Sequence, residues 1–181
     1  MNIKKTANLL LNFATKRLAE IFGIITFISG TMLLVALITY SPEDPNFIFP
    51  ENTEIKNLLG FQGSYVSDLL FQSVGIIAYL ISFTLMITGI NIFRIKEFFL
   101  IIGNIFFATL YCIFGTLFLT FFYSKDFVLY INGNGGFIGN YLSQTFLNSL
   151  IQINENLSYY ILILLISILF LISINFSPTK F

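Results

Sequence analysis

The chain has 181 residues, of which 56% are hydrophobic and only 10% charged, and its formal net charge is zero. A soluble domain carries about a quarter charged residues, so this chain cannot cover its surface with polar groups, and lipid must be the solvent for much of it. Zero net charge gives no support to nucleic-acid binding, and one cysteine with no histidine excludes a disulfide framework and the usual metal clusters.

Four apolar segments follow one another, at about 21–40, 66–93, 98–123 and 158–176. Each reaches or approaches the ~20 residues that a helix needs to cross a bilayer. The second and third are nearly continuous, and as one helix they would be roughly 87 Å long against a hydrocarbon core of ~30 Å. Residues 94–97 are the charged break between them, so we expect a tight turn there. The predicted fold is an all-α integral membrane protein with four transmembrane helices and two periplasmic loops.

The basic residues predict the orientation of these spans. Basic residues stay in the cytoplasm, and seven of the nine lie before the first span, between the second and third, or after the fourth: Lys4, Lys5, Lys16, Arg17, Arg94, Lys96 and Lys180. We therefore expect residues 1–20 to be a basic cytoplasmic segment, 21–176 the membrane domain and 177–181 the start of a cytoplasmic linker. The first apolar run is too long for a signal peptide, which favours a retained anchor.

The first outer segment is predicted to form a compact cap rather than a loose tether. Pro42 prevents the first helix from continuing, and Gly60 and Gly63 allow a tight turn before the second span. Asp44 is expected to be oriented by backbone N–H groups within its turn, and Asp68 to lie in the first turn of a helix, where the macrodipole favours a carboxylate. The candidate cap residues are Tyr40, Pro42, Asp44, Pro45, Phe47, Asn57, Gly60, Gly63 and Asp68.

Small residues recur on one face of the second span and, more briefly, of the third. Such residues let helices approach closely in lipid. They predict helix packing, either within a four-helix bundle or, as the alternative, between subunits of an oligomer. The residues are Gly75, Ala78, Ser82 and Gly89, then Ala108, Cys112 and Gly115.

The second outer segment begins with a glycine-rich stretch at 133–136, which we interpret as a flexible turn. In residues 137–153, asparagine and glutamine recur every four positions opposite apolar residues. This pattern predicts an amphipathic helix that lies on the outer membrane surface or on the bundle. A small transporter or channel subunit is the alternative function, but the spans offer few of the ionisable residues that such a protein needs.

Three motifs, in the same order along the chain, resemble the amino-terminal four-helix membrane region of FtsK/SpoIIIE-type DNA translocases. Residues 40–47, YSPEDPNF, are similar to that family's Y-x-P-x-D-P-x-W/F segment. Residues 57–79, NLLGFQGSYVSDLLFQSVGIIAY, are similar to its N-x-x-G-x-x-G-A-x-x-A-D-x-L-x-x-x-F-G-x-x-A-Y run, with Ser64 and Ser67 at alanine positions and Val74 at a phenylalanine position. Gly135, Gly136 and Gly139, followed by Leu-Ser, resemble its second outer loop. The resemblance covers about residues 20–176.

The resemblance implies a membrane-anchoring, septum-targeting domain at the bacterial inner membrane, acting in cell division and chromosome segregation. It also implies a homo-oligomer, a hexamer in this family, and contact with membrane proteins of the division septum. Full-length members continue into a RecA-like ATPase motor. No Walker A sequence is present in these residues, so we expect a fragment or a motor-less member, with no enzyme activity, no cofactor and no direct nucleic-acid contact by this segment.

Overall fold

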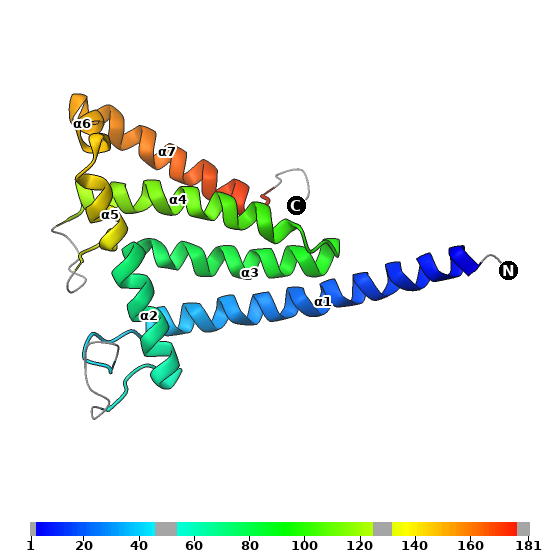
Figure 1. The fold of residues 1–181 in the computed structure, drawn as a ribbon. Helices are drawn as coiled ribbons and strands as arrows, with labels where there is room; N and C mark the ends of the chain where they lie inside the picture. The colour runs from blue at the N-terminus through cyan, green and yellow to red at the C-terminus, as the bar shows by residue number, and fades with distance from the viewer. Residues whose placement is uncertain (1–2, 46–53, 125–131, 177–181) are drawn as a thin grey trace.

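The computed structural model describes residues 3–45, 54–124 and 132–176, and all regular structure within these ranges is helical (Figure 1). Four stretches are long and apolar enough to cross a membrane, namely Asn8–Ile38, Gly60–Ile95, Leu100–Phe122 and Glu155–Ser173. The predicted all-α membrane fold is confirmed. The elements are α1 (Ile3–Ile38), α2 (Gly60–Val74), the 3₁₀ turn η1 (Gly75–Ile77), α3 (Ala78–Ile95), α4 (Leu100–Phe122), α5 (Gly136–Ser143), α6 (Phe146–Ile153) and α7 (Glu155–Ser173).

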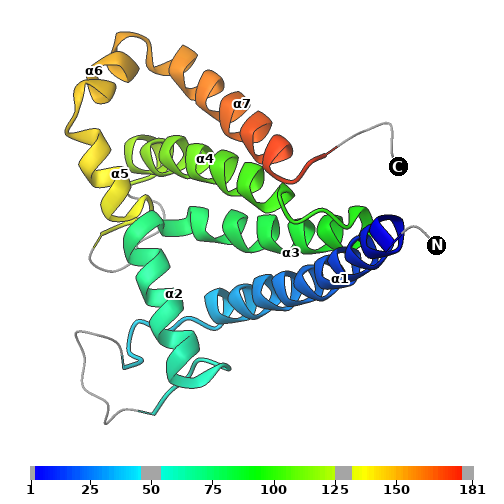
Figure 2. The same ribbon diagram turned by 45° about the vertical axis from the view of Figure 1, so that its right-hand side comes forward.

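The four long helices form an open row rather than a closed bundle. Figures 1 and 2 show α1, α3, α4 and α7 side by side in that order, with α1 and α7 at the two edges. The most extensive contacts join α1 to α3 and α4 to α7, whereas α3 and α4 touch more sparsely. An open row leaves more helix surface for lipid or for other chains than a closed bundle does.

The predicted second span, 66–93, is divided by a bend. Gly75 has a φ of 61°, a left-handed conformation that favours glycine, and it ends α2. Helix α2 then lies across the end of α1, and α3 alone runs beside α1 and α4 (Figures 1 and 2). Gly75 therefore does not continue the packing stripe of Ala78, Ser82 and Gly89, as the sequence pattern had suggested.

The amphipathic helix expected over 137–153 is also divided, into α5 and α6. Thr145 lies between them as the N-cap of α6, where its hydroxyl accepts from the N–H of Leu147 at 3.4 Å. Asn154 caps α7 in the same way, accepting from Leu157 N at 3.1 Å, and Glu155 lies in the first turn of α7. Local capping by polar side chains competes with helix continuation, and here it starts two new helices.

The two ends of the row differ in construction. Helices α2, α5 and α6 gather at one end, together with residues 40–45 (Figure 1). The α3–α4 turn and the end of α7 lie at the other, and the first turns of α1 project beyond them. The candidate site lies at the first of these ends, because the sequence motifs of both outer segments meet there.

Candidate functional site

Asp44 is the centre of the cap, which we define as residues 40–45 and 54–68. Its side chain is 1% exposed. One carboxylate oxygen accepts from Lys56 N and the other from Asn57 N, both at 2.9 Å. The sequence predicted backbone donors for Asp44 but placed them within its own turn. The donors lie 12 and 13 residues further along the chain, so the carboxylate closes the whole loop.

Asn57 connects this loop to the end of α1. Its amide group donates to Ala36 O at 2.9 Å, and its oxygen accepts from Leu59 N at 3.1 Å. The last carbonyls of a helix have no partner within the helix. In this structure Thr39, Asn57 and Tyr79 supply side-chain donors to the carbonyls of the last turn of α1, at Val35, Ala36 and Leu37. These three carbonyls at the end of α1 therefore have side-chain donors from three places in the chain: Thr39 after α1, Asn57 in the cap and Tyr79 in α3.

Gly60 and Gly63 serve the cap for different reasons. Gly60 has a φ of 65°, and a methyl group there would meet open space. Gly63 is helical, but a methyl group there would overlap Asn57 Oδ1 and lie 2.5 Å from Leu59 Cβ. The first glycine is required by backbone conformation and the second by close approach.

Asp68 does not lie in the first turn of a helix, so its predicted macrodipole role is wrong. Helix α2 begins at Gly60, six residues before the predicted start of the span, which places Asp68 in its third turn. The carboxylate instead accepts from the hydroxyl of Tyr40 at 3.0 Å. Burial, and then the negative charge of Asp68, raise the pKa of the Tyr40 phenol well above its ordinary value. The ring of Tyr40 also packs on Phe71, with centroids 4.9 Å apart.

The remaining cap residues divide into a buried and an exposed set. Pro45 is fully buried, and its carbonyl accepts from the hydroxyl of Ser64 at 3.1 Å. Ser64 and Ser67, which stand at the alanine positions of the motif that residues 57–79 resemble, are both 1% exposed or less. Glu43 forms an exposed ion pair with Lys56, and this pairing lowers the pKa of the Glu43 carboxyl. Phe47, the ninth candidate, lies outside the described residues, and Pro42 is half-buried.

The second outer segment docks onto the bend at Gly75. Ile76 N donates to Asn134 O at 3.0 Å, and a methyl group at Gly75 would overlap that same carbonyl oxygen. Gly136 has a φ of 65°, and a methyl group there would lie 2.6 Å from Ser73 C and 2.7 Å from Gly75 N. The bend and the loop therefore need glycine on both sides of one contact.

Gly135 and Gly139 lie against α4. A methyl group at Gly139 would lie 2.5 Å from Thr116 O, and one at either glycine would overlap Thr120 Oγ1. Asn134 is 1% exposed and donates to Tyr123 O at 2.5 Å. Residues 134–136 are thus tightly packed, unlike the flexible turn that the composition of this stretch suggested, whereas a methyl group at Gly133 would meet open space. Sequence reasoning missed Asn134 altogether, because asparagine between glycines is the ordinary composition of a loop.

Helix packing along the row uses small residues on both partners. A methyl group at Gly89 would lie 2.5 Å from Phe27 N and 2.7 Å from Gly23 O, so α3 touches the backbone of α1. Ala78 and Ser82 are fully buried. Gly23 and Gly30 complete this contact from α1, and the analysis of the sequence missed them although their spacing of seven puts them on one helix face. On α4, Gly115 lies against Ile77, and Ala108 and Cys112 pack nearby.

Charged residues at the opposite end of the row fasten α1 to the α3–α4 turn. Glu20 binds Arg17 and Lys96, each at 2.6 Å, and the Glu20 side chain is only 15% exposed. Lys96 is itself in the left-handed conformation that ends α3, with a φ of 66°. This cluster joins the basic segment before the first span to the basic turn between the second and third.

The buried carboxylates of the cap hold the fold together through hydrogen bonds. Both buried acids of the cap are held by donors, Asp44 by two backbone N–H groups and Asp68 by a tyrosine hydroxyl. In the described ranges, no group of three or more histidine, cysteine, aspartate or glutamate side chains could hold a metal ion. The geometry fixes two outer segments on the ends of membrane helices. It defines a multi-pass helical membrane protein with a hydrogen-bonded cap at one end.

Residues 15–181 match the family described as the 4TM region of DNA translocase FtsK/SpoIIIE. The chain belongs to this family, as the three motifs predicted, and is a multi-pass inner-membrane protein. It matches the membrane region and not the ATPase motor.

Three relatives, each named DNA translocase FtsK, illustrate the similarity. The chain is 37% identical over 69 residues to the protein of Caulobacter vibrioides, 32% over 72 to that of Rickettsia typhi and 35% over 79 to that of Azospirillum brasilense. These matches cover 38%, 40% and 42% of this chain but only 8%, 10% and 12% of the relatives. The chain thus matches about a tenth of the length of its curated relatives. No solved structure matches it.

Proposed function

We propose that this chain is the membrane anchor of an FtsK-type DNA translocase and holds it at the division septum during chromosome segregation. The observation that carries the proposal is the family match over residues 15–181, which reaches all four spans and includes both outer segments. In this function the four helices retain the protein in the inner membrane, and the cap and bend present a fixed surface to the periplasm. This segment itself makes no direct contact with nucleic acid.

Both termini are cytoplasmic in this proposal. The charge cluster of Arg17, Glu20 and Lys96 supports that orientation, because Lys16 and Arg94 lie at the same end and basic residues are retained inside. The cap at the opposite end holds a single described basic residue, Lys56, which is paired with Glu43. The cap and helices α5 and α6 are then periplasmic.

Assembly into a homo-oligomer, a hexamer by the family resemblance, is part of the same proposal. The open row supports it, because most of the residues in its long helices are not buried within the chain. In the most apolar 18-residue stretch of α7 only 11% of the residues are buried, and in the corresponding stretches of α1 and α4 only 28%. This uncovered helix surface is available to lipid, to further copies of the chain and to membrane proteins of the septum.

The orientation is tested with single cysteines in a Cys112→Ala background. Glu54 and Ser149 are exposed at the cap end, and Glu97 is exposed at the α3–α4 turn. Glu54→Cys and Ser149→Cys should react with a membrane-impermeant maleimide in intact spheroplasts, whereas Glu97→Cys should react only after lysis. The opposite labelling pattern would reverse the orientation.

Septum targeting is tested with a fluorescent protein fused to the N-terminus in a dividing rod-shaped bacterium. The fusion should concentrate at midcell in constricting cells. A matched fusion carrying Gly75→Leu, which places a large side chain on Asn134, should lose this enrichment. Uniform membrane fluorescence from the parent fusion, with a monodisperse profile in detergent to show that it is folded, would refute the targeting role.

A further inference from the structure

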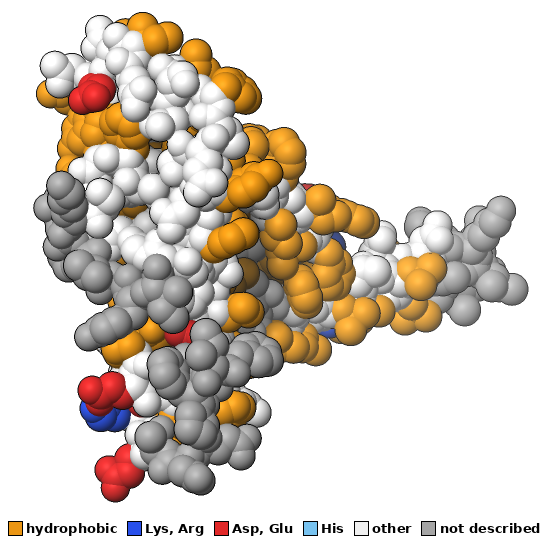
Figure 3. Space-filling view, turned by 60° about the vertical axis from the view of Figure 1, so that its left-hand side comes forward, with side chains coloured by type: hydrophobic (Ala, Val, Ile, Leu, Met, Phe, Trp, Pro, Cys, Tyr) orange, Lys and Arg blue, Asp and Glu red, His pale blue; other side chains and the backbone are white. Residues whose placement is uncertain are grey.

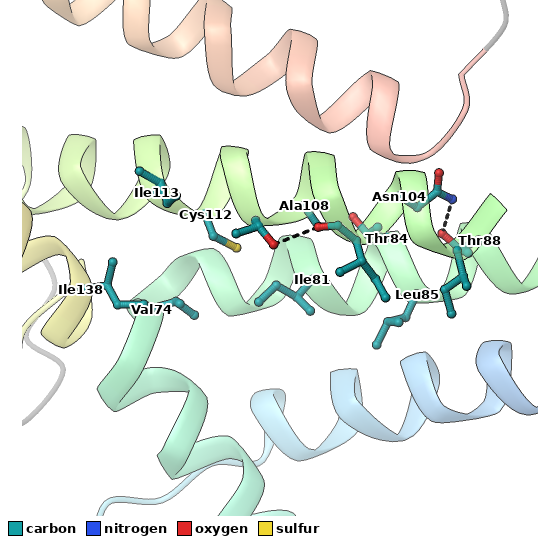
Figure 4. A pocket seen from close by; sticks show the side chains of 13 residues that line it. Val74, Ile81, Thr84, Leu85, Thr88, Asn104, Ala108, Cys112, Ile113 and Ile138 are labelled. Atoms are coloured by element: carbon teal, nitrogen blue, oxygen red, sulfur yellow. Dashed lines mark hydrogen bonds between the residues drawn. The ribbon is translucent and has the colours of Figure 1, made fainter. Parts of the chain in front are cut away.

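A long groove lies between α3 and α4, where these two helices touch sparsely. Its volume is about 320 Å³. Ile81, Ala108 and Cys112 line its middle, Ile101 one end, and Val74 with Ile138 the other. Figure 4 shows Ile81, Ala108 and Cys112 along α3 and α4, with Val74 and Ile138 at the end where α2 and α5 lie. The groove is at the depth of the membrane spans, since α3 and α4 both belong to them.

The polar side chains on its wall are already paired with protein groups. Thr84 shares a hydrogen bond of 3.0 Å with the hydroxyl of Tyr111, and Thr88 accepts from the amide of Asn104 at 2.7 Å. Thr109 donates to Ile105 O at 3.0 Å. The buried side-chain atoms that lack a partner in the described ranges, Thr120 Oγ1 and Asn134 Oδ1, belong to residues outside this lining. The polar side chains of the wall therefore need no hydrogen bond from a ligand. The rest of the lining is apolar and is suited to contact with a hydrocarbon chain.

The shape of the groove is too narrow for a helix. Its lining extends along α4 from Ile101 to Ile113, which at ~1.5 Å per residue is roughly 18 Å. Counting the space at its open mouth, the groove has about 830 Å³ of empty volume, which over that length gives a mean cross-section of at most ~46 Å². A helix with its side chains is ~10 Å across, a cross-section of ~80 Å², so a helix does not fit inside the groove. A single extended hydrocarbon chain is much thinner than a helix and does fit.

The groove is continuous with the lipid-facing surface. Ile105 lines it and is still 55% exposed, and Ile102, one turn away, is 62% exposed. An unfilled space of this size would leave its lining without van der Waals partners. We propose that the groove binds one acyl chain of a membrane phospholipid, which fills the space between α3 and α4 as a stoichiometric part of the fold. This inference depends on the membrane location and not on the proposed septal function.

The chain has no tryptophan, so one introduced tryptophan reports on its own surroundings. Ile105→Trp places the reporter at the mouth of the groove, and Leu164→Trp places one on the surface of α7, where Leu164 is 63% exposed. Each purified variant is titrated in detergent with phosphatidylethanolamine brominated on its acyl chains. The groove reporter should show quenching that saturates near one lipid per chain, whereas the α7 reporter should show a gradual, non-saturating decrease.

Ala108→Phe in the Ile105→Trp background fills the groove with a ring and should abolish the saturating phase. Leu164→Phe in that background is the matched control and should leave it unchanged. The same non-saturating decrease for both reporters, or no quenching at the groove, would overturn the proposal. Native mass spectrometry distinguishes a second copy of the chain as the occupant. If the parent forms a dimer without bound lipid and Ala108→Phe abolishes that dimer, the groove is a contact between two copies instead. Because the Ile105→Trp titration does not use the filling substitution, a folding failure of Ala108→Phe does not prevent the test.

Discussion

The cap should open locally when the Asp44 carboxylate is removed. In Asp44→Ala, the N–H groups of Lys56 and Asn57 lose their acceptors, each at 2.9 Å, in a site where the parent side chain is 1% exposed. A hydrogen bond to a charged group contributes ~1.5–3 kcal/mol, so the loss of two predicts a cost of ~3–6 kcal/mol. Every ~1.4 kcal/mol is a factor of ten, so the amides of the cap should exchange at least ~100-fold faster if they exchange by local opening.

Hydrogen–deuterium exchange of a peptide that contains residues 54–59, measured in detergent, reports this opening directly. Glu43→Gln is the matched control, because it changes a neighbouring carboxylate whose ion pair with Lys56 is exposed. Exposed pairs contribute little to stability, so the control should exchange like the parent. Unchanged protection of this peptide in Asp44→Ala would refute the view that the buried carboxylate closes the loop.

Three further substitutions test the packing and the cap. Gly89→Ala forces the backbones of α1 and α3 apart and should destabilise the fold by the ~1–3 kcal/mol typical of overpacking, which lowers the thermal aggregation temperature in detergent; Gly103→Ala, whose methyl group meets open space, should leave that temperature unchanged, and equal effects would show that the α1–α3 contact is loose. Gly75→Ala combines overlap with a positive φ, so it should destabilise more than Gly60→Ala, which has the positive φ alone and a cost of ~1–2 kcal/mol; the same aggregation assay ranks them. Tyr40→Phe should remove one phenol that ionises above the ordinary pKa of 10.0 from the ultraviolet titration. Because the folded-state pKa is raised, the stabilisation from this phenol is complete below the ordinary pKa and is lost as pH rises through the raised pKa; removal of a phenol that titrates at or below 10.0 would contradict the buried contact with Asp68.

Several features of this protein follow from its sequence alone. The number of spans is fixed by composition, because only a helix of apolar residues can satisfy its backbone in lipid. The need for a turn at 94–97 follows from helix length against bilayer thickness. Asp44 and Asn57 were also among the cap residues predicted from the sequence, since proline, aspartate, asparagine and glycine together are typical of ordered turns.

Other features depend on which residues meet in space, and the sequence pattern did not reveal them. Asp44 takes its donors from residues 12 and 13 positions away, and Asp68 is bound by Tyr40 at a separation of 28. The bend at Gly75 lies within a continuous apolar run of the sequence. It is held by the carbonyl of Asn134, which accepts from Ile76 N and which comes after the third span in the sequence. An apolar pattern states that a segment is in lipid but not which helix lies beside it. The open row, and with it the groove between α3 and α4, is therefore decided only by the long-range contacts of the tertiary structure.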